Sequence, residues 1–235
     1  MITLAGWFYL AFFGLLIPWL AFRSRDKLAA HGSVPRERHF VSVIFQLLVF
    51  LVISLVVARV QLIPVWKAPG GRWLPWIVAA GFVALGVLLM RPRWRAGVVK
   101  RDPKIRLFMP ATPRERSLWV LLSVAAGVSE EVTYRGVLFA LFWIWTGSPL
   151  AAAAIAAVIF GVSHVVQGWQ AAGIVTLIAL AAHGLVWLDG TLYPVIAAHI
   201  VYDVIAGLTY GRLGKELGYP DSASSGITPD PLPTP

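Results

Sequence analysis

The chain has 235 residues, of which 58% are hydrophobic and only 13% are charged, and its mean hydropathy is +0.76. Soluble domains contain about 45–50% apolar and about 25% charged residues, so this composition excludes an ordinary water-soluble globular protein. The formal net charge is +9, but the basic residues are concentrated between apolar runs, which favours a role in membrane topology over nucleic-acid binding. The chain contains no cysteine, which excludes disulfides, thiolate metal ligands and a thiol nucleophile.

Apolar segments follow one another along the chain, and most are long enough to cross the roughly 30 Å hydrocarbon core as a helix. They predict an all-α polytopic transmembrane helical bundle of about seven spans, within a range of about six to eight. The first segment lacks a basic start and is too long for a signal-peptide core, so we expect a retained span. The predicted spans are residues 2–22, 39–60, 73–91, 117–145, 149–165, 171–188 and 191–210.

Lysine and arginine counts predict how these spans are oriented. The loop 23–38 has five basic residues and the loop 91–116 has nine, whereas 146–148 and 189–190 have none. With seven spans, both basic loops and the C-terminus lie in the cytoplasm, and the N-terminus lies outside. The loop 91–116 is primarily a topology signal, with contact to anionic lipids or an acidic substrate segment as a secondary role.

The domain organisation follows from the same pattern. Residues 1–215 are predicted to form one transmembrane helical domain. The remainder, 216–235, is polar and rich in Pro, Ser and Gly, which predicts a disordered cytoplasmic tail. Within the fifth span, the run PLAAAAIAAVIFG (149–161) consists mainly of small residues and is typical of a helix face that packs closely against another helix.

Ionisable side chains inside the predicted spans mark candidate functional positions, because each costs about 2.5–3.5 kcal/mol on insertion scales. Glu131 and Arg135 are four residues apart, share a helix face and are predicted to form a buried pair. Glu130 is rotated about 100° from Glu131 and has no local cation, which suits a general base. The full set is Glu130, Glu131, Arg135, His164, His183, His199 and Asp203.

Three of these side chains are expected to meet at similar depth. At about 1.5 Å per residue, Glu130 lies ~20 Å from either end of its segment, while His164 and His199 lie ~22 Å and ~12 Å from the outer ends of theirs. A glutamate and two histidines around a water-filled cleft form a hydrolytic constellation. We expect Glu130 and His164 to deprotonate water, and His199, helped by Asp203 one turn later, to stabilise the oxyanion.

The same residues also form a candidate zinc site, with Glu130, His164 and His199 as ligands and water in the fourth position. Against this, the sequence lacks HExxH, the ligands come from three spans, and a zinc-bound Glu130 would leave the site without a base. We therefore expect a mechanism without metal or other cofactor, with a zinc-dependent membrane metalloprotease as the alternative. The expected partners are a peptide or membrane-associated protein substrate and the lipid bilayer, and no nucleic acid.

Three motifs carry a resemblance to a known family. Residues 130–135 read EExxxR, residues 160–164 read FxxxH, and residues 199–203 read HxxxN/D. In this order, on successive hydrophobic segments, they resemble the CPBP family of intramembrane proteases. That family includes the type II CAAX prenyl endopeptidases and bacterial Abi-type proteins linked to bacteriocin processing and immunity. The resemblance covers roughly 115–210, which would be the protease core.

The resemblance implies hydrolysis of a peptide bond, either CAAX-type or in leader or C-terminal signal processing, in a bacterial inner or plasma membrane. It implies that Glu130 and His164 activate water, that His199 and residue 203 form the oxyanion site, and that Glu131 and Arg135 have a supporting role. Many members have Asn where this chain has Asp203. An ionised Asp cannot donate a hydrogen bond, so Asp203 is either protonated or only orients His199.

Two other functions remain open from the sequence. A non-catalytic, Abi-like immunity protein would bind a toxin peptide or partner and would not need Glu130. A proton-coupled carrier also uses buried Glu, His and Asp side chains, but the sequence has no inverted repeat or pair of broken helices to support it. His183 matches none of the three motifs and is predicted to serve helix packing or to line a cavity.

Overall fold

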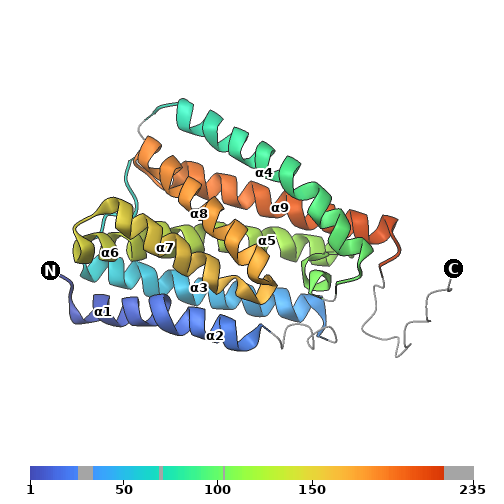
Figure 1. Cartoon of the computed structure of the whole chain (residues 1–235), viewed down its shortest axis with the longest axis horizontal. Coiled ribbons are helices and arrows are strands. Elements are labelled where there is room, and N and C mark those ends of the chain that lie inside the picture. Colours follow the sequence, from blue (N-terminus) through green and yellow to red (C-terminus); the bar gives the residue numbers. More distant parts are fainter. Residues whose placement is uncertain (26–33, 69–70, 103, 220–235) are drawn as a thin grey trace.

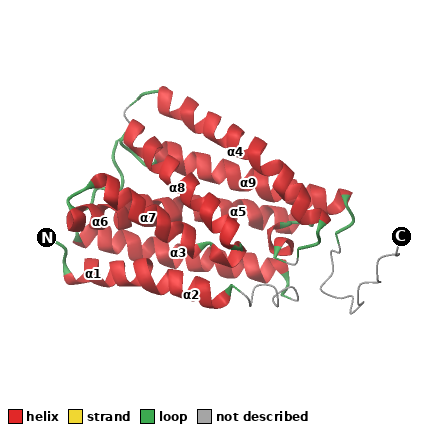
Figure 2. Cartoon of the chain, in the orientation of Figure 1, coloured by secondary structure: helices red, strands yellow, loops and turns green. Residues whose placement is uncertain are grey.

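The computed structural model describes residues 1–25, 34–68, 71–102 and 104–219. Within these residues every regular element is a helix and there is no strand, as Figure 2 shows. The predicted all-α class is therefore confirmed. Of the predicted C-terminal tail, residues 220–235 lie outside the described part of the chain, so its disorder stays a prediction.

Across the described residues, helical rods occupy all seven predicted positions, and rods that follow one another in the sequence run in opposite directions along the bundle (Figure 1). The first and the fourth rods each contain a π-helical segment between two α-helices. The rods are α1 (Leu4–Ala11), η1 (Phe12–Leu16) and α2 (Ile17–Ser24); α3 (Arg36–Val60); α4 (Leu74–Val99); α5 (Pro113–Glu130), η4 (Glu131–Leu138) and α6 (Phe139–Thr146); α7 (Pro149–Ser163); α8 (Trp169–Asp189); and α9 (Tyr193–Glu216). Two short 3-10 turns, η3 (Ile105–Phe108) and η5 (Val165–Gln167), lie in the connections.

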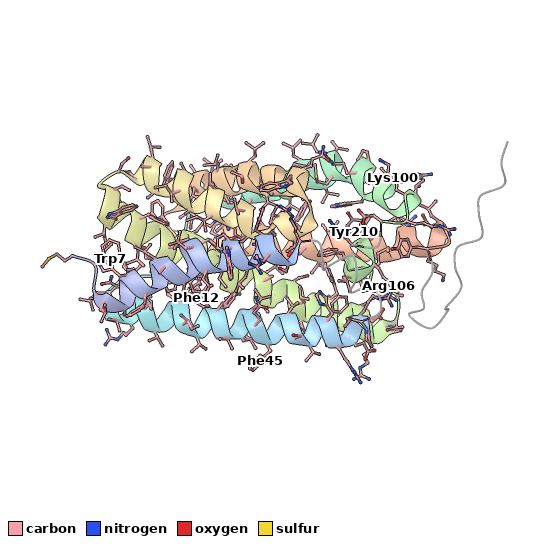
Figure 3. The ribbon with its side chains drawn as sticks, turned by 60° about the horizontal axis from the view of Figure 1, so that its bottom comes forward. Trp7, Phe12, Phe45, Lys100, Arg106 and Tyr210 are labelled. Carbon is pink, nitrogen blue, oxygen red and sulfur yellow. The ribbon has the colours of Figure 1, made fainter. Side chains whose placement is uncertain are left out.

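The outer surface of the bundle is apolar. Among the described helices, five are long and apolar enough to cross a membrane, namely the rod Leu4–Ser24 together with α3, α4, α8 and α9. Phe45 on α3 is 68% exposed and points away from the bundle in Figure 3. An exposed phenylalanine is stable in contact with acyl chains but not as part of a large apolar surface in water. The protein is an integral membrane protein.

Helix α4 differs from the prediction at its C-terminal end. The loop predicted over 91–116 begins later, because α4 continues to Val99 and carries Arg91 and Arg95 on the helix. Hydropathy marks where apolar residues stop, but arginine is a good helix former and does not end a helix. The last turns of α4 are held by packing, since Trp94 and Val98 are buried in a cluster with Leu213 of α9.

Small residues bring the later helices close together. Ala152, Ala153, Ala156 and Ala157 are buried on one side of α7, which packs along α8. A Cβ atom at Gly161 of α7 would collide with the Thr176 side chain of α8. The small-residue run is therefore a close-packing face, as predicted, because only short side chains let two backbones approach this closely.

Candidate active site

The EExxxR motif lies at a change of helix type. Helix α5 begins with a capping box, in which the Thr112 side chain accepts from the Glu115 amide and the Glu115 side chain accepts from the Thr112 amide. The α-helix ends at Glu130, and the π-helical segment η4 begins at Glu131. A π-helical segment widens the helix locally and is frequent at functional sites. Here the widened part carries the motif and packs against α3, α5, α6 and α7.

A glycine brings α5 against α9 next to the motif. A Cβ atom at Gly127 would lie 2.5 Å from Ile200 Cγ1 and 3.3 Å from the carbonyl oxygen of Ile196. Position 127 therefore accepts only glycine without moving α9. Trp119 ties the same two helices together, because its Nε1 donates to the Asp203 carbonyl oxygen at 2.8 Å. These contacts place the buried acids of the first motif beside the third motif.

Glu131 joins the first and third motifs. Its Oε1 accepts from Arg135 Nη1 at 3.1 Å, which is the predicted i,i+4 pair, and also from His199 Nδ1 at 2.7 Å. The Glu131 and Arg135 side chains are each only 2% exposed. An ion pair this buried, with an imidazole on the same oxygen, holds the His199 ring in one orientation.

The second ring nitrogen of His199 faces two other acids. Its Nε2 lies 3.7 Å from Glu130 Oε2 and 3.4 Å from Asp203 Oδ2. Glu130 therefore has an imidazole partner from α9, although it has no cation on its own helix. Asp203 was predicted either to be protonated or only to orient His199. It faces Nε2, the nitrogen that also faces Glu130, whereas the partner of Nδ1 is Glu131.

Exposure separates the motif residues into two groups. The side chains of Glu130, His199 and Asp203 remain 21%, 17% and 27% exposed, whereas those of Glu131 and Arg135 are almost completely buried. These three side chains, which meet at His199 Nε2, therefore keep part of their surface exposed. The buried pair behind them holds the His199 ring through Glu131 and adds no net charge.

The second motif comes from α7. The His164 ring packs on Phe160 with centroids 4.5 Å apart, as predicted from their spacing, and His164 Nδ1 lies 2.8 Å from the Phe160 carbonyl oxygen. Phe160 also contacts the first motif, because the Arg135 guanidinium lies 4.4 Å from the centre of its ring. His164 interacts electrostatically with Glu130, as do His199 and Asp203. All predicted site residues are thus brought together.

The zinc alternative needs at least three ligands around one point, and it stays a prediction. Among the described residues, no three or more His, Cys, Asp or Glu side chains are arranged to hold a metal ion. His199 uses Nδ1 for Glu131 and His164 uses Nδ1 for a backbone carbonyl, so only Nε2 of each ring could bind a metal, and no ligand cluster surrounds these nitrogens among the described residues. We therefore derive no step through a metal.

His183 is the residue whose position the sequence did not reveal. It is 2% exposed, and its ring packs on Phe139 with centroids 5.2 Å apart. It interacts electrostatically with both Glu131 and Arg135. Within the part of the chain that the structure describes, its Nε2 has no hydrogen-bond partner, and neither have Glu131 Oε2 and Arg135 Nε. A histidine inside an apolar span was the available signal, but no motif connected it to the acids.

Comparison with known proteins agrees with this arrangement. Residues 112–205 match the family described as type II CAAX prenyl endopeptidase Rce1-like. The matched region contains all three motifs, from Glu130 to Asp203. No curated protein and no solved structure matches the chain. Members of that family are proteases that act on a peptide or protein substrate in a membrane. Over these residues, which are less than half of the chain, the protein is similar to the Rce1-like type II CAAX prenyl endopeptidases.

Proposed function

We propose that this protein is an intramembrane endopeptidase that hydrolyses a peptide bond with a water molecule activated by Glu130 and His164. The observation that supports this most is the arrangement around His199. One ring nitrogen is held by Glu131 at 2.7 Å, while the other faces Glu130 at 3.7 Å in accessible surroundings. A ring fixed on one side, with its other nitrogen open beside a carboxylate, suits a site where charge develops during hydrolysis.

The base function is assigned to Glu130, assisted by His164. A backbone carbonyl only accepts hydrogen bonds, so the contact between His164 Nδ1 and the Phe160 carbonyl requires the proton on Nδ1. In the neutral ring this leaves Nε2 as an acceptor for a water proton. Glu130 takes the proton of the attacking water, the water oxygen bonds to the carbonyl carbon, and the proton then passes to the leaving amine as the C–N bond breaks.

The oxyanion function is assigned to His199. Its Nδ1 donates to Glu131, so a proton on Nε2 makes the ring an imidazolium that donates to the developing oxyanion. The Glu131 carboxylate, 2.7 Å from Nδ1, stabilises this positive charge. Asp203 lies 3.4 Å from Nε2 and assists as a neutral acid, since an ionised carboxylate there would repel the oxyanion.

The substrate class is a peptide or membrane-associated protein cut in CAAX-type or signal-type processing. We place the protein in a bacterial inner or plasma membrane with its N-terminus outside. Basic residues at one end of the bundle support this orientation. At the end where α2 and α9 terminate and α3 and α5 begin (Figure 1) lie Arg36, Arg106, Arg116 and Lys215. Positive residues are enriched on the cytoplasmic side of membrane proteins.

The test begins with the substrate. Membrane proteomes are compared between cells that express the full chain and cells that express Glu130→Gln, and peptides whose processing depends on Glu130 are identified. The purified protein then cleaves these peptides in liposomes, and Glu130→Gln lowers the rate about 10²–10⁴-fold, the usual contribution of a general base. Exposed Glu37→Gln is the matched control and keeps the wild-type rate.

Each alternative has its own outcome in this test. If Glu130→Gln stays folded and cleaves at the wild-type rate, the proposed mechanism is wrong. If no processing depends on Glu130 but a toxin-protection phenotype survives its loss, the protein is a binding protein of the same fold. Loss of cleavage on chelation, with stoichiometric zinc in the active protein, would establish the metalloprotease instead.

A further inference from the structure

A cavity lined by no residue of the three motifs lies on the side of the bundle where α4 packs along α9. The two helices run in the same direction in Figure 1. Between them is a groove with a volume of about 810 Å³. This size is within the range of small-molecule sites. None of the proposed catalytic residues lines this groove, so it is available for a separate ligand.

One end of the groove is strongly cationic. Arg91 and Arg95 of α4 and Arg212 of α9 line it, together with the single carboxylate of Glu216. Arg212 Nε lies 2.6 Å from Glu216 Oε1, while Arg91 and Arg95 act on Glu216 only electrostatically. Three guanidinium groups against one carboxylate leave two formal positive charges. The groove therefore favours an anionic group near Arg91 and Arg95.

The other end of the groove is apolar. Val87 and Leu88 of α4 and Ile205 of α9 line it. At about 1.5 Å per residue, Arg91 and Arg212 lie about 25–29 Å from the start of their helices, whereas Leu88 and Ile205 lie about 18–21 Å from it. The charged end is thus at the level of one membrane surface, and the apolar end is deeper in the hydrocarbon.

The spacing of the two helices is held by an aromatic cluster beside the groove. The Trp94 ring is 5% exposed and lies 5.9 Å from the Tyr202 ring and 5.8 Å from the Tyr210 ring, measured between centroids. Trp94 lies between Arg91 and Arg95 in sequence and is buried against α9. This packing fixes the rotation of α4 at which the two arginines line the groove. The groove is therefore a defined feature and not a gap between loosely associated helices.

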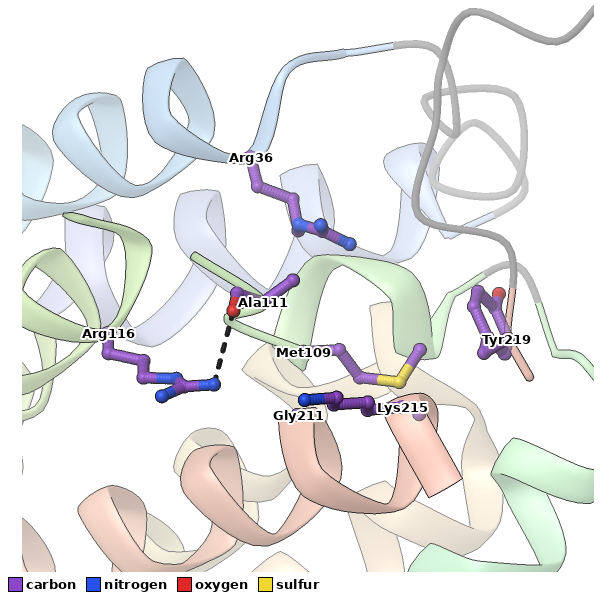
Figure 4. A pocket seen from close by; sticks show the side chains of 8 residues that line it. Arg36, Met109, Ala111, Arg116, Gly211, Lys215 and Tyr219 are labelled. Carbon is purple, nitrogen blue, oxygen red and sulfur yellow. Dashed lines mark hydrogen bonds between the residues drawn. The ribbon is translucent and has the colours of Figure 1, made fainter. Parts of the chain in front are cut away.

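A smaller cavity at the same end of the molecule is a weaker candidate. It has a volume of about 210 Å³ and is lined by Arg36, Arg116 and Lys215, among others (Figure 4). Arg36 is paired with Glu115 at 3.0 Å, and Arg116 donates to the Ala111 carbonyl oxygen, the contact drawn in Figure 4. Arg36 and Arg116 therefore already bind protein groups, and the lining has no apolar end that reaches into the membrane.

We propose that the groove between α4 and α9 binds an anionic phospholipid, with its phosphate between Arg91 and Arg95 and an acyl chain along Leu88 and Ile205. Charge complementarity selects the phosphate, and the polarity gradient along the groove matches the direction of a lipid in the bilayer. Arginine suits this role because its planar fork binds phosphate oxygens in pairs. The site is independent of the proposed peptidase reaction.

The test measures lipid binding to the full chain. Delipidated protein in detergent is titrated with phosphatidylglycerol or phosphatidylcholine, and bound lipid is counted by native mass spectrometry. We expect one phosphatidylglycerol to bind about 25-fold more tightly than phosphatidylcholine, from about fivefold for each of two arginines. Arg91→Gln/Arg95→Gln abolishes this preference, and Arg91→Lys/Arg95→Lys keeps part of it because the charge remains.

The matched control removes the same charge outside the groove. Arg93 and Lys100 are exposed at the same end of α4 but do not line the groove, so Arg93→Gln/Lys100→Gln keeps the preference. An equal loss in this control would mean general surface attraction and would overturn the proposal. Equal binding of both lipids, or binding of inorganic phosphate and glycerol phosphate as tight as that of phosphatidylglycerol, would overturn it as well. Circular dichroism and gel filtration confirm that each variant is folded.

Discussion

Replacing Glu131 tests whether this residue acts through His199 or only stabilises the bundle. In Glu131→Gln the shape is kept, but Arg135 loses its carboxylate in a position where both side chains are only 2% exposed. Breaking a buried ion pair by removing one partner costs about 3–5 kcal/mol, so the variant should unfold more easily. Because His199 Nδ1 also loses its anionic partner at 2.7 Å, cleavage should fall about 10²–10³-fold.

A second substitution separates the two effects. Glu131→Gln/Arg135→Met removes the unpaired cation and places an apolar side chain of similar length against Phe160, so most of the lost stability should return. Cleavage should stay low, because nothing in the double variant restores the carboxylate beside His199. Thermal unfolding in detergent measures stability, and single-turnover cleavage in liposomes measures activity. Recovery of activity together with stability would refute the assignment of Glu131 as the positioning residue of His199.

Three further substitutions test other contacts of the site. Gly127→Leu should push α5 away from α9, which lowers cleavage at least 10²-fold and costs about 1–3 kcal/mol of stability. In the control Gly81→Leu, where nothing lies within 4 Å of an added Cβ, neither cleavage nor stability should change. Equal effects of the two variants would contradict the close approach of α5 and α9. Asp203→Asn should cleave at a rate within about tenfold of wild type, because an amide N–H donates to an oxyanion. Asp203→Leu should lower the cleavage rate about 10²-fold. A slower rate for Asp203→Asn than for Asp203→Leu would contradict this role. His183→Leu should keep full cleavage activity and raise the free energy of unfolding by about 1–2 kcal/mol, because it removes a buried nitrogen that has no partner among the described residues. Thermal unfolding measures the gain. A tenfold loss of cleavage would make His183 part of the site.

The sequence alone determined the fold class and most helix positions. Long apolar runs with few charges have no stable form in the bilayer except helices, since every backbone amide and carbonyl must find its partner inside the segment. The same scarcity of charge made the candidate site visible, because each buried ionisable residue had to have a reason to be there. The pair of Glu131 with Arg135 and the packing of Phe160 on His164 followed from i,i+4 spacing.

Boundaries between membrane and water were harder to predict. Hydropathy ends at Arg91, but α4 continues to Val99 because Trp94 and Val98 are buried against α9. The π-helical segment at the EExxxR motif was also beyond prediction, since a change of helical hydrogen bonding depends on neighbours and not on residue type.

Only the tertiary structure decided which acid meets which nitrogen. Glu131 and His199 are 68 residues apart, and helical periodicity relates residues only within a turn or two of one another. Their contact depends on how closely α5 and α9 approach at Gly127, and on the rotation of each helix about its axis. The sequence therefore specified the chemical groups available for hydrolysis, while interhelical packing determined that Glu131 holds His199 and leaves Glu130 and Asp203 at its open nitrogen.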